Sequence, residues 1–149
     1  MTASKQNTLP ASGSFLTILR KIDRKPADSI ESMQRIAEAQ ASVLREALLG
    51  PICQLPDYLP NMLPSITVEY VGTLPVAGLS YWGEHRWHIH IRKDDPAEER
   101  AFTALYHLKR IIDHPLRRQT SRFTETDWDA LARYFAERVL APSRRLIPT

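Results

Sequence analysis

The spacing of apolar residues changes twice along this chain, and this change constrains the fold more than any other feature. Between residues 29 and 49 apolar residues recur at three- and four-residue steps, as on the buried face of a helix. Between residues 66 and 91 they alternate with polar residues, as in strands that bury one face. The helical spacing returns after residue 95. This order predicts an α+β domain in which helices pack on a small sheet.

The alternating region contains candidate strands over residues 66–70, 77–82 and 87–91. The sequence Gly-Glu-His at 83–85 is expected to form a hairpin turn between the last two. From this order we predict a small antiparallel sheet.

Proline marks the expected ends of the other elements. Prolines recur between residues 51 and 64 and predict a rigid connector, because proline neither continues a long helix nor pairs inside a sheet. The helix that starts near Asp95 is expected to end at about Asp113, because Pro115 disfavours helical geometry in the residue before it. A last helix is expected over 126–141.

The chain of 149 residues has the length of one domain. Residues 1–13 are mostly small and polar without periodicity, so we predict a flexible tail followed by a single domain over 14–149. Residues 14–25 mix apolar and basic side chains and predict a short amphipathic helix. This helix would pack on its own domain or dock to a partner.

Composition limits the function classes. The chain is 43% hydrophobic and 25% charged, and it contains no run of roughly 20 apolar residues. The N-terminus also lacks the apolar block of a secretory signal, so we expect a cytoplasmic protein that does not contact the membrane. A single cysteine, Cys53, permits neither an internal disulfide nor a thiolate zinc cage.

The net charge of +3 comes from basic and acidic residues that are interspersed, which is a poor match to a dedicated nucleic-acid binder. Several arginines toward the C-terminus could nevertheless form a basic patch. They are Arg117, Arg118, Arg122, Arg138, Arg144 and Arg145.

Two C-terminal segments, "ERAFTALYHLKRIIDHP" (99–115) and "DWDALARYFAERVLAP" (127–142), resemble the signature of the ImmA/IrrE family of zinc metallo-endopeptidases. That family has an R-F-T-type segment leading into a helical H-E-x-x-H, then D-H-P, then a second helix containing Y-F-A. Phe102-Thr103 and Tyr134-Phe135-Ala136 match the outer motifs here. The resemblance covers about 30–146 and implies a zincin-like fold with a degenerate active-site helix.

The zinc motif itself is replaced. The alignment places Tyr106-His107-Leu108-Lys109-Arg110 over H-E-x-x-H, so Tyr106 and Arg110 stand at the histidine positions and His107 at the glutamate position. The chemistry requires two histidines on one helical face and a glutamate that deprotonates the zinc-bound water. Arginine is a permanent cation that repels a divalent metal. The resemblance therefore implies a pseudoenzyme without a bound metal.

Asp129 lies near the expected position of the third zinc ligand, a glutamate in the family. We predict that Arg110 and Asp129 form an ion pair that links the two helices in place of zinc. The alternative is that both are ordinary surface residues.

A relocated zinc site remains an alternative. His88 and His90 share one face of a predicted strand, about 7 Å apart from the strand rise, and could bind zinc with a carboxylate. They could equally line the solvated side of that strand. His107 and His114 lie roughly 10.5 Å apart along their helix, too far to share an ion.

The family resemblance implies proteins that act on helix-turn-helix repressors, often in phages and mobile elements. The first hypothesis is a catalytically degenerate homologue that binds such a repressor, or another regulatory protein, without cleaving it. The alternatives are an active zinc metallo-endopeptidase with a non-standard ligand set and a nucleic-acid-binding regulator. The sequence assigns neither the partner nor the oligomeric state.

Overall fold

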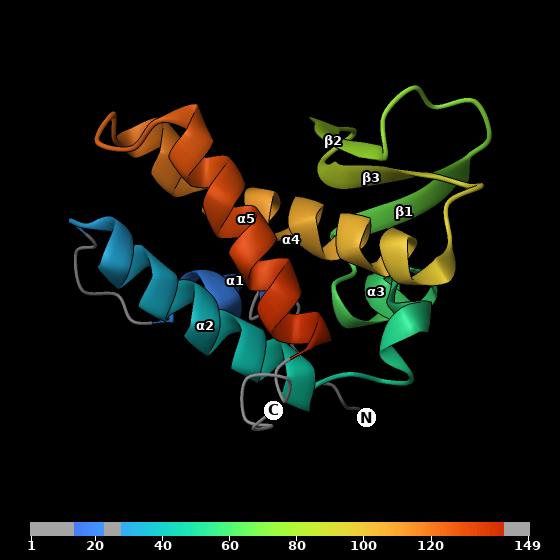
Figure 1. The fold of residues 1–149 in the computed structure, drawn as a ribbon, viewed down its shortest axis with the longest axis horizontal. Coiled ribbons are helices and arrows are strands. Elements are labelled where there is room, and N and C mark those ends of the chain that lie inside the picture. Colours follow the sequence, from blue (N-terminus) through green and yellow to red (C-terminus); the bar gives the residue numbers. More distant parts are fainter. Residues whose placement is uncertain (1–13, 23–27, 142–149) are drawn as a thin grey trace, which may run out of the picture.

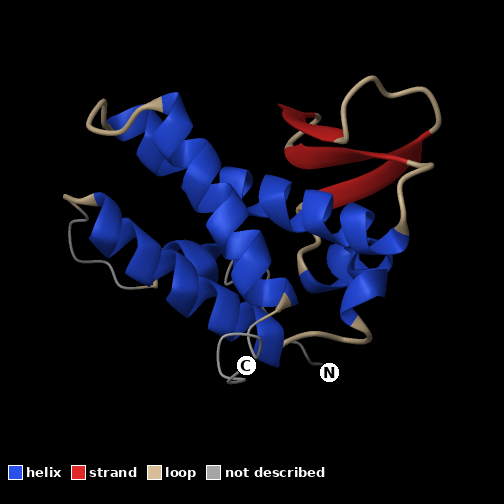
Figure 2. Cartoon of the chain, in the orientation of Figure 1, coloured by secondary structure: helices blue, strands red, loops and turns tan. Residues whose placement is uncertain are grey.

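A three-stranded sheet and five α-helices make up residues 14–22 and 28–141, which are the residues described by this computed structural model (Figures 1 and 2). The predicted α+β class is confirmed. The predicted tail at 1–13 lies outside the described residues, as do 23–27 and 142–149. The elements are α1 (Phe15–Arg20), α2 (Ile30–Glu46), the 3-10 helix η3 (Ile52–Gln54), α3 (Leu55–Met62), β1 (Ile66–Val71), β2 (Gly78–Gly83), β3 (Arg86–Arg92), α4 (Ala97–Gln119) and α5 (Glu125–Leu140).

The sheet has the strand order β1-β3-β2 and is mixed. Strands β2 and β3 form the predicted antiparallel hairpin, in which Glu84 and His85 both adopt positive φ. Strand β1, however, pairs with β3 in parallel, so the prediction of an antiparallel sheet is wrong for this strand. The reason is the connection at 72–77, which carries the chain past the position of β3 to the far edge (Figure 1).

The alternation of the strands places their apolar residues against α4. Ile66, Ile89 and Ile91 are fully buried in the main core. Polar residues such as Thr67 and His88 lie side by side on the opposite face. In Figure 1, α4 runs between the sheet and the pair formed by α2 and α5.

Helix α4 continues through Pro115 to Gln119, so its predicted end near Asp113 is wrong. Proline has no N–H to donate to the carbonyl four residues earlier, which belongs to Ile111. Arg20 at the end of α1 donates Nη2–H to this carbonyl at 2.7 Å and Nε–H to the Ile112 carbonyl at 3.3 Å. The helix therefore tolerates proline because a side chain from another element supplies the missing donor.

The proline-rich segment contains no long helix and no strand, as predicted, but it includes the two short helices η3 and α3. Pro56 lies in the first turn of α3, where a backbone N–H has no intrahelical acceptor. Pro60 removes one further hydrogen bond. Burial of Leu55, Leu59 and Leu63 offsets this loss, since these side chains are fully buried against the core.

A buried polar chain links α4, α2 and α1. Lys109 is 0% exposed, and its Nζ donates to Gln40 Oε1 at 2.7 Å and to Asp113 Oδ1 at 2.8 Å. Gln40 in turn donates to the Leu19 carbonyl at 3.0 Å. Helix α1, the described part of the helix predicted at 14–25, therefore packs on its own domain, with Leu16 and Leu19 buried. Residues 23–25 of that prediction lie outside the described residues.

No helix within the described ranges combines the length and the apolar character that a membrane-spanning segment needs.

Candidate functional site

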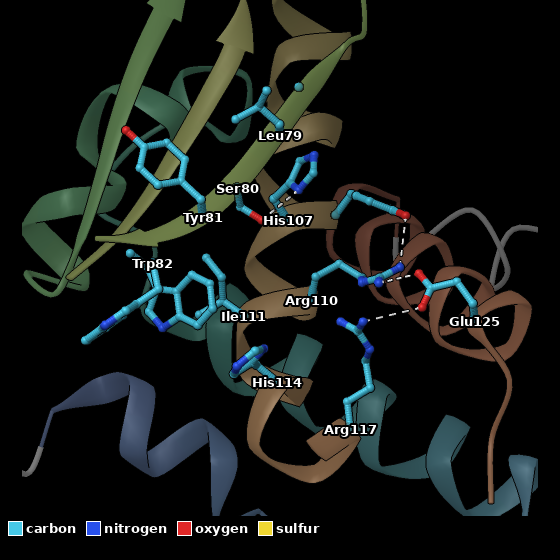
Figure 3. A pocket seen from close by; sticks show the side chains of 13 residues that line it. Leu79, Ser80, Tyr81, Trp82, His107, Arg110, Ile111, His114, Arg117 and Glu125 are labelled. Atoms are coloured by element: carbon cyan, nitrogen blue, oxygen red, sulfur yellow. Dashed lines mark hydrogen bonds and ion pairs between the residues drawn. The ribbon is translucent and has the colours of Figure 1, made fainter. Parts of the chain in front are cut away.

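A cleft of about 560 Å³ lies between strand β2, the second half of α4 and the start of α5 (Figure 3). Residues from each of these three elements line it. They include Ser80 and Trp82 of β2, His107, Arg110, His114 and Arg117 of α4, and Glu125 of α5.

Helical and strand periodicity bring these residues to one place. Positions 107, 110, 114 and 117 recur at three- and four-residue steps, so they share one face of α4. Residues 78, 80 and 82 alternate along β2 and pair with the buried side of β3. The cleft therefore lies between the face of β2 that carries residues 78, 80 and 82 and the face of α4 that carries residues 107, 110, 114 and 117.

Two hydrogen-bonded links join α4 to α5 beside the cleft. The Tyr106 hydroxyl donates to Asp129 Oδ1 at 2.5 Å, and Arg110 Nη2 donates to Glu125 Oε2 at 2.5 Å. Arg110 Nη1 also donates to the Tyr106 hydroxyl at 3.4 Å. Burial and the Asp129 bond raise the pKa of Tyr106, while the bonds from Tyr106 and Arg133 lower the pKa of Asp129.

The predicted direct pair between Arg110 and Asp129 is therefore wrong, although both residues belong to one network. Arg110 binds Glu125, and Asp129 binds Arg133 and Tyr106. Glu125 lies one turn before Asp129 on the same face of α5, so the i,i+4 spacing makes it a second candidate partner that the sequence alone does not distinguish from Asp129. A capping box between Thr124 and Asp127 begins the helix at Glu125.

His107 connects α4 to the edge strand. Its Nδ1 lies 3.2 Å from Ser80 Oγ, and its ring also hydrogen-bonds the backbone of Gly78. Burial, assisted by the charge of Arg110, lowers the pKa of His107 to about 4. The ring is neutral at pH 7, but a group with this pKa is a weak general base, so the Ser80–His107 pair is poorly suited to nucleophilic catalysis.

The close contact between β2 and α4 requires a glycine at residue 78. A Cβ at this position would lie 2.8 Å from the His90 carbonyl oxygen and would overlap Thr103 of α4. Any larger residue would push the strand away from the helix that carries His107.

His88 and His90 lie on the other face of the sheet, away from this cleft. Both ring nitrogens of His88 are engaged, with Thr67 Oγ1 at 2.7 Å and the Gly83 carbonyl at 2.9 Å. His90 Nε2 lies 3.3 Å from Glu69. The described residues contain no group of three or more His, Cys, Asp or Glu placed to hold a metal, so this alternative zinc site lacks a ligand set.

The residues aligned with the expected zinc motif fit zinc no better. The Tyr106 hydroxyl is occupied by Asp129, and the Arg110 guanidinium is a cation that would repel the metal.

Two arginines of the predicted basic patch lie close to acidic side chains. Arg117 lies 3.6 Å from Glu125, and Arg138 pairs with Glu38 at 2.9 Å. Arg118 and Arg122 are exposed, and residues 144–145 fall outside the described part of the chain.

The cleft offers an open strand edge, aromatic surface and cations. Strand β2 pairs only with β3 among the described strands, so one of its edges is free to pair. Trp82 of this strand is 57% exposed and Tyr81 is 45% exposed.

Comparisons with protein-family models, curated proteins and solved structures found no match to this chain.

Proposed function

We propose that this chain is a catalytically inactive, zincin-like relative of the ImmA/IrrE peptidases that binds a protein partner in the cytoplasm. The partner class is a helix-turn-helix transcriptional repressor of phage or mobile-element type, as the sequence resemblance implies. The observation that supports the proposal is the bonding of Tyr106 and Arg110, which the sequence resemblance aligns with the zinc-ligand positions. Both residues join α4 to α5, while the adjacent cleft stays open.

The mode of binding follows from the edge strand. An extended segment of the partner would pair with the free edge of β2, so that backbone hydrogen bonds supply affinity. Alternate side chains of that segment would enter the cleft and supply specificity. The exposed ring of Trp82 provides apolar contact area for them.

Loss of peptidase chemistry is supported by the side chains beside the cleft. Hydrolysis by a zincin needs a metal-bound water and a carboxylate base. Here the base position holds His107, which is bonded to Ser80 and is neutral. The two cross-links connect α4 and α5, as a zinc ion bound at the aligned positions would do in the proposed relatives.

Metal analysis tests the degenerate motif. Protein purified without chelators is expected to contain near-zero zinc, and the double variant Tyr106→His/Arg110→His is expected to take up zinc. Each single variant is the matched control, because one new histidine supplies too few ligands to hold the ion. Stoichiometric zinc in the native protein would overturn the proposal.

Incubation with helix-turn-helix repressors from phages of the same host tests the partner class. An intact complex on size-exclusion chromatography is expected, with the repressor uncleaved. Chelator-sensitive cleavage of the repressor would restore the peptidase alternative.

A further inference from the structure

We infer that the cleft selects partner segments that carry a carboxylate side chain, which binds Arg110 and Arg117, and that Glu125 occupies this carboxylate position in the free protein. The inference rests on the proposed function, because it names the chemistry of the segment that pairs with β2.

The charges in the cleft are unbalanced. Glu125 is the one acid among the described lining residues, and it faces two arginines, at 2.5 Å from Arg110 and 3.6 Å from Arg117 (Figure 3). His114 adds no positive charge, since burial and the neighbouring Arg118 and Arg117 lower its pKa. One cation in excess therefore remains in the cleft.

The guanidinium groups of Arg110 and Arg117 can both donate hydrogen bonds to a second carboxylate. Arginine presents five N–H donors in a planar fork that matches a carboxylate. Arg117 makes only a long contact with Glu125, and its side chain is 40% exposed. A ligand carboxylate at this position would form shorter, charge-assisted hydrogen bonds than those available now.

Glu125 can yield its position to a ligand. Its side chain is 65% exposed at the first residue of α5, so water replaces its ion pairs at little cost. It therefore acts as an internal competitor of an incoming acid. Removing its charge is expected to tighten binding of acidic segments.

Aromatic rings on the opposite side of the cleft favour a segment that carries both an acidic and an apolar side chain. Trp82 and Trp87 pack edge to face at 5.5 Å, and Trp87 packs on His114 at 4.9 Å. These rings exclude water near Arg110 and Arg117 when a segment is bound, which strengthens the ion pair. An extended segment that presents an acid toward α4 and an apolar residue two positions away toward Trp82 fits both features.

The test is selection of random extended heptapeptides, displayed on phage, on four immobilised proteins. These are the wild type, Arg117→Gln, the matched control Arg122→Gln, which changes an exposed arginine outside the cleft, and Trp82→Ala. On the wild type and on Arg122→Gln we expect Asp or Glu to be enriched about tenfold at one position, as suits a charge-assisted pair. On Arg117→Gln this enrichment is expected to disappear, and Trp82→Ala is expected to lose selected peptides altogether.

Selected peptides are then compared with copies that carry Gln at the enriched position. The acidic form should bind the wild type about tenfold more tightly, and Glu125→Gln should increase this preference. Peptides that depend on Trp82 but show no acid preference would overturn the inference and leave the proposed function standing. Failure to select any peptide on the wild type would overturn both.

Discussion

A single histidine joins two elements beside the cleft. His107 lies on α4 and bonds β2 through Ser80 and Gly78. Burial penalises the charged form of the ring, so the folded protein favours neutral His107. The stability of the fold therefore depends on pH at this residue.

We predict that His107 makes the protein less stable in acid. Its pKa is about 4 when folded and 6.5 in the unfolded chain, so the unfolded state binds more protons between these values. The stabilisation is complete above pH 6.5 and is lost as the pH falls toward 4, up to about 3 kcal/mol in the free energy of unfolding. Urea unfolding at pH 7.5 and 4.5 measures it.

The non-titrating variant His107→Gln is expected to lose a smaller part of its stability over the same pH interval. His85→Gln, in the exposed hairpin turn, controls for the loss of one histidine. An unchanged pH dependence in His107→Gln would show that the ring is not the responsible group.

At the scale of elements, the structure shows which features local sequence can predict. The apolar spacing located α2, α5 and the three strands, because each buries one face and ends at strong local signals. The parallel partner of β1 was not predictable in this way, since pairing depends on a connection with no pattern of its own. The helix through Pro115 was missed because its compensating donor, Arg20, is remote in sequence.

The same distinction applies to the site. The sequence motif located Tyr106, Arg110 and Asp129, which belong to one network in the structure. It did not locate Glu125, because the crossing of α4 and α5 decides which turn of α5 faces Arg110.

We predict that Arg20 and Pro115 are energetically coupled. Arg20→Met is expected to lower the free energy of unfolding by about 1–3 kcal/mol, because the buried Ile111 carbonyl loses its donor. In a Pro115→Ala background the cost should be smaller, because the alanine N–H can bond the same carbonyl. A double-mutant cycle from urea unfolding measures the coupling, and equal costs in the two backgrounds would refute it.

At the scale of the whole molecule, the buried side chain of Lys109 links the helices α4, α2 and α1 through hydrogen bonds. Lys109 bridges Asp113 of its own helix and Gln40 of α2, which bonds α1. Burial raises the pKa of Asp113, and its Oδ2 has no hydrogen-bond partner among the described residues. The network therefore depends on the lysine charge to balance a desolvated carboxylate.

Lys109→Met is expected to reduce the free energy of unfolding by about 3–5 kcal/mol, because it leaves Asp113 buried without its cation. The double variant Lys109→Met/Asp113→Leu should recover a large part of this loss, since it removes both charges. Chemical denaturation measures both variants. A double variant no more stable than Lys109→Met would show that the ion pair itself, and not the orphaned carboxylate, accounts for the loss.

The mixed sheet also has a consequence for the order of folding. The β2–β3 hairpin closes over the short turn at Glu84 and His85. Strand β1, in contrast, is separated from its partner β3 by the connection at 72–77 and the whole of β2. Closing a longer loop costs more chain entropy, and non-local pairs slow folding. The edge strand that borders the cleft is therefore expected to pair early, and β1 is expected to complete the sheet afterwards.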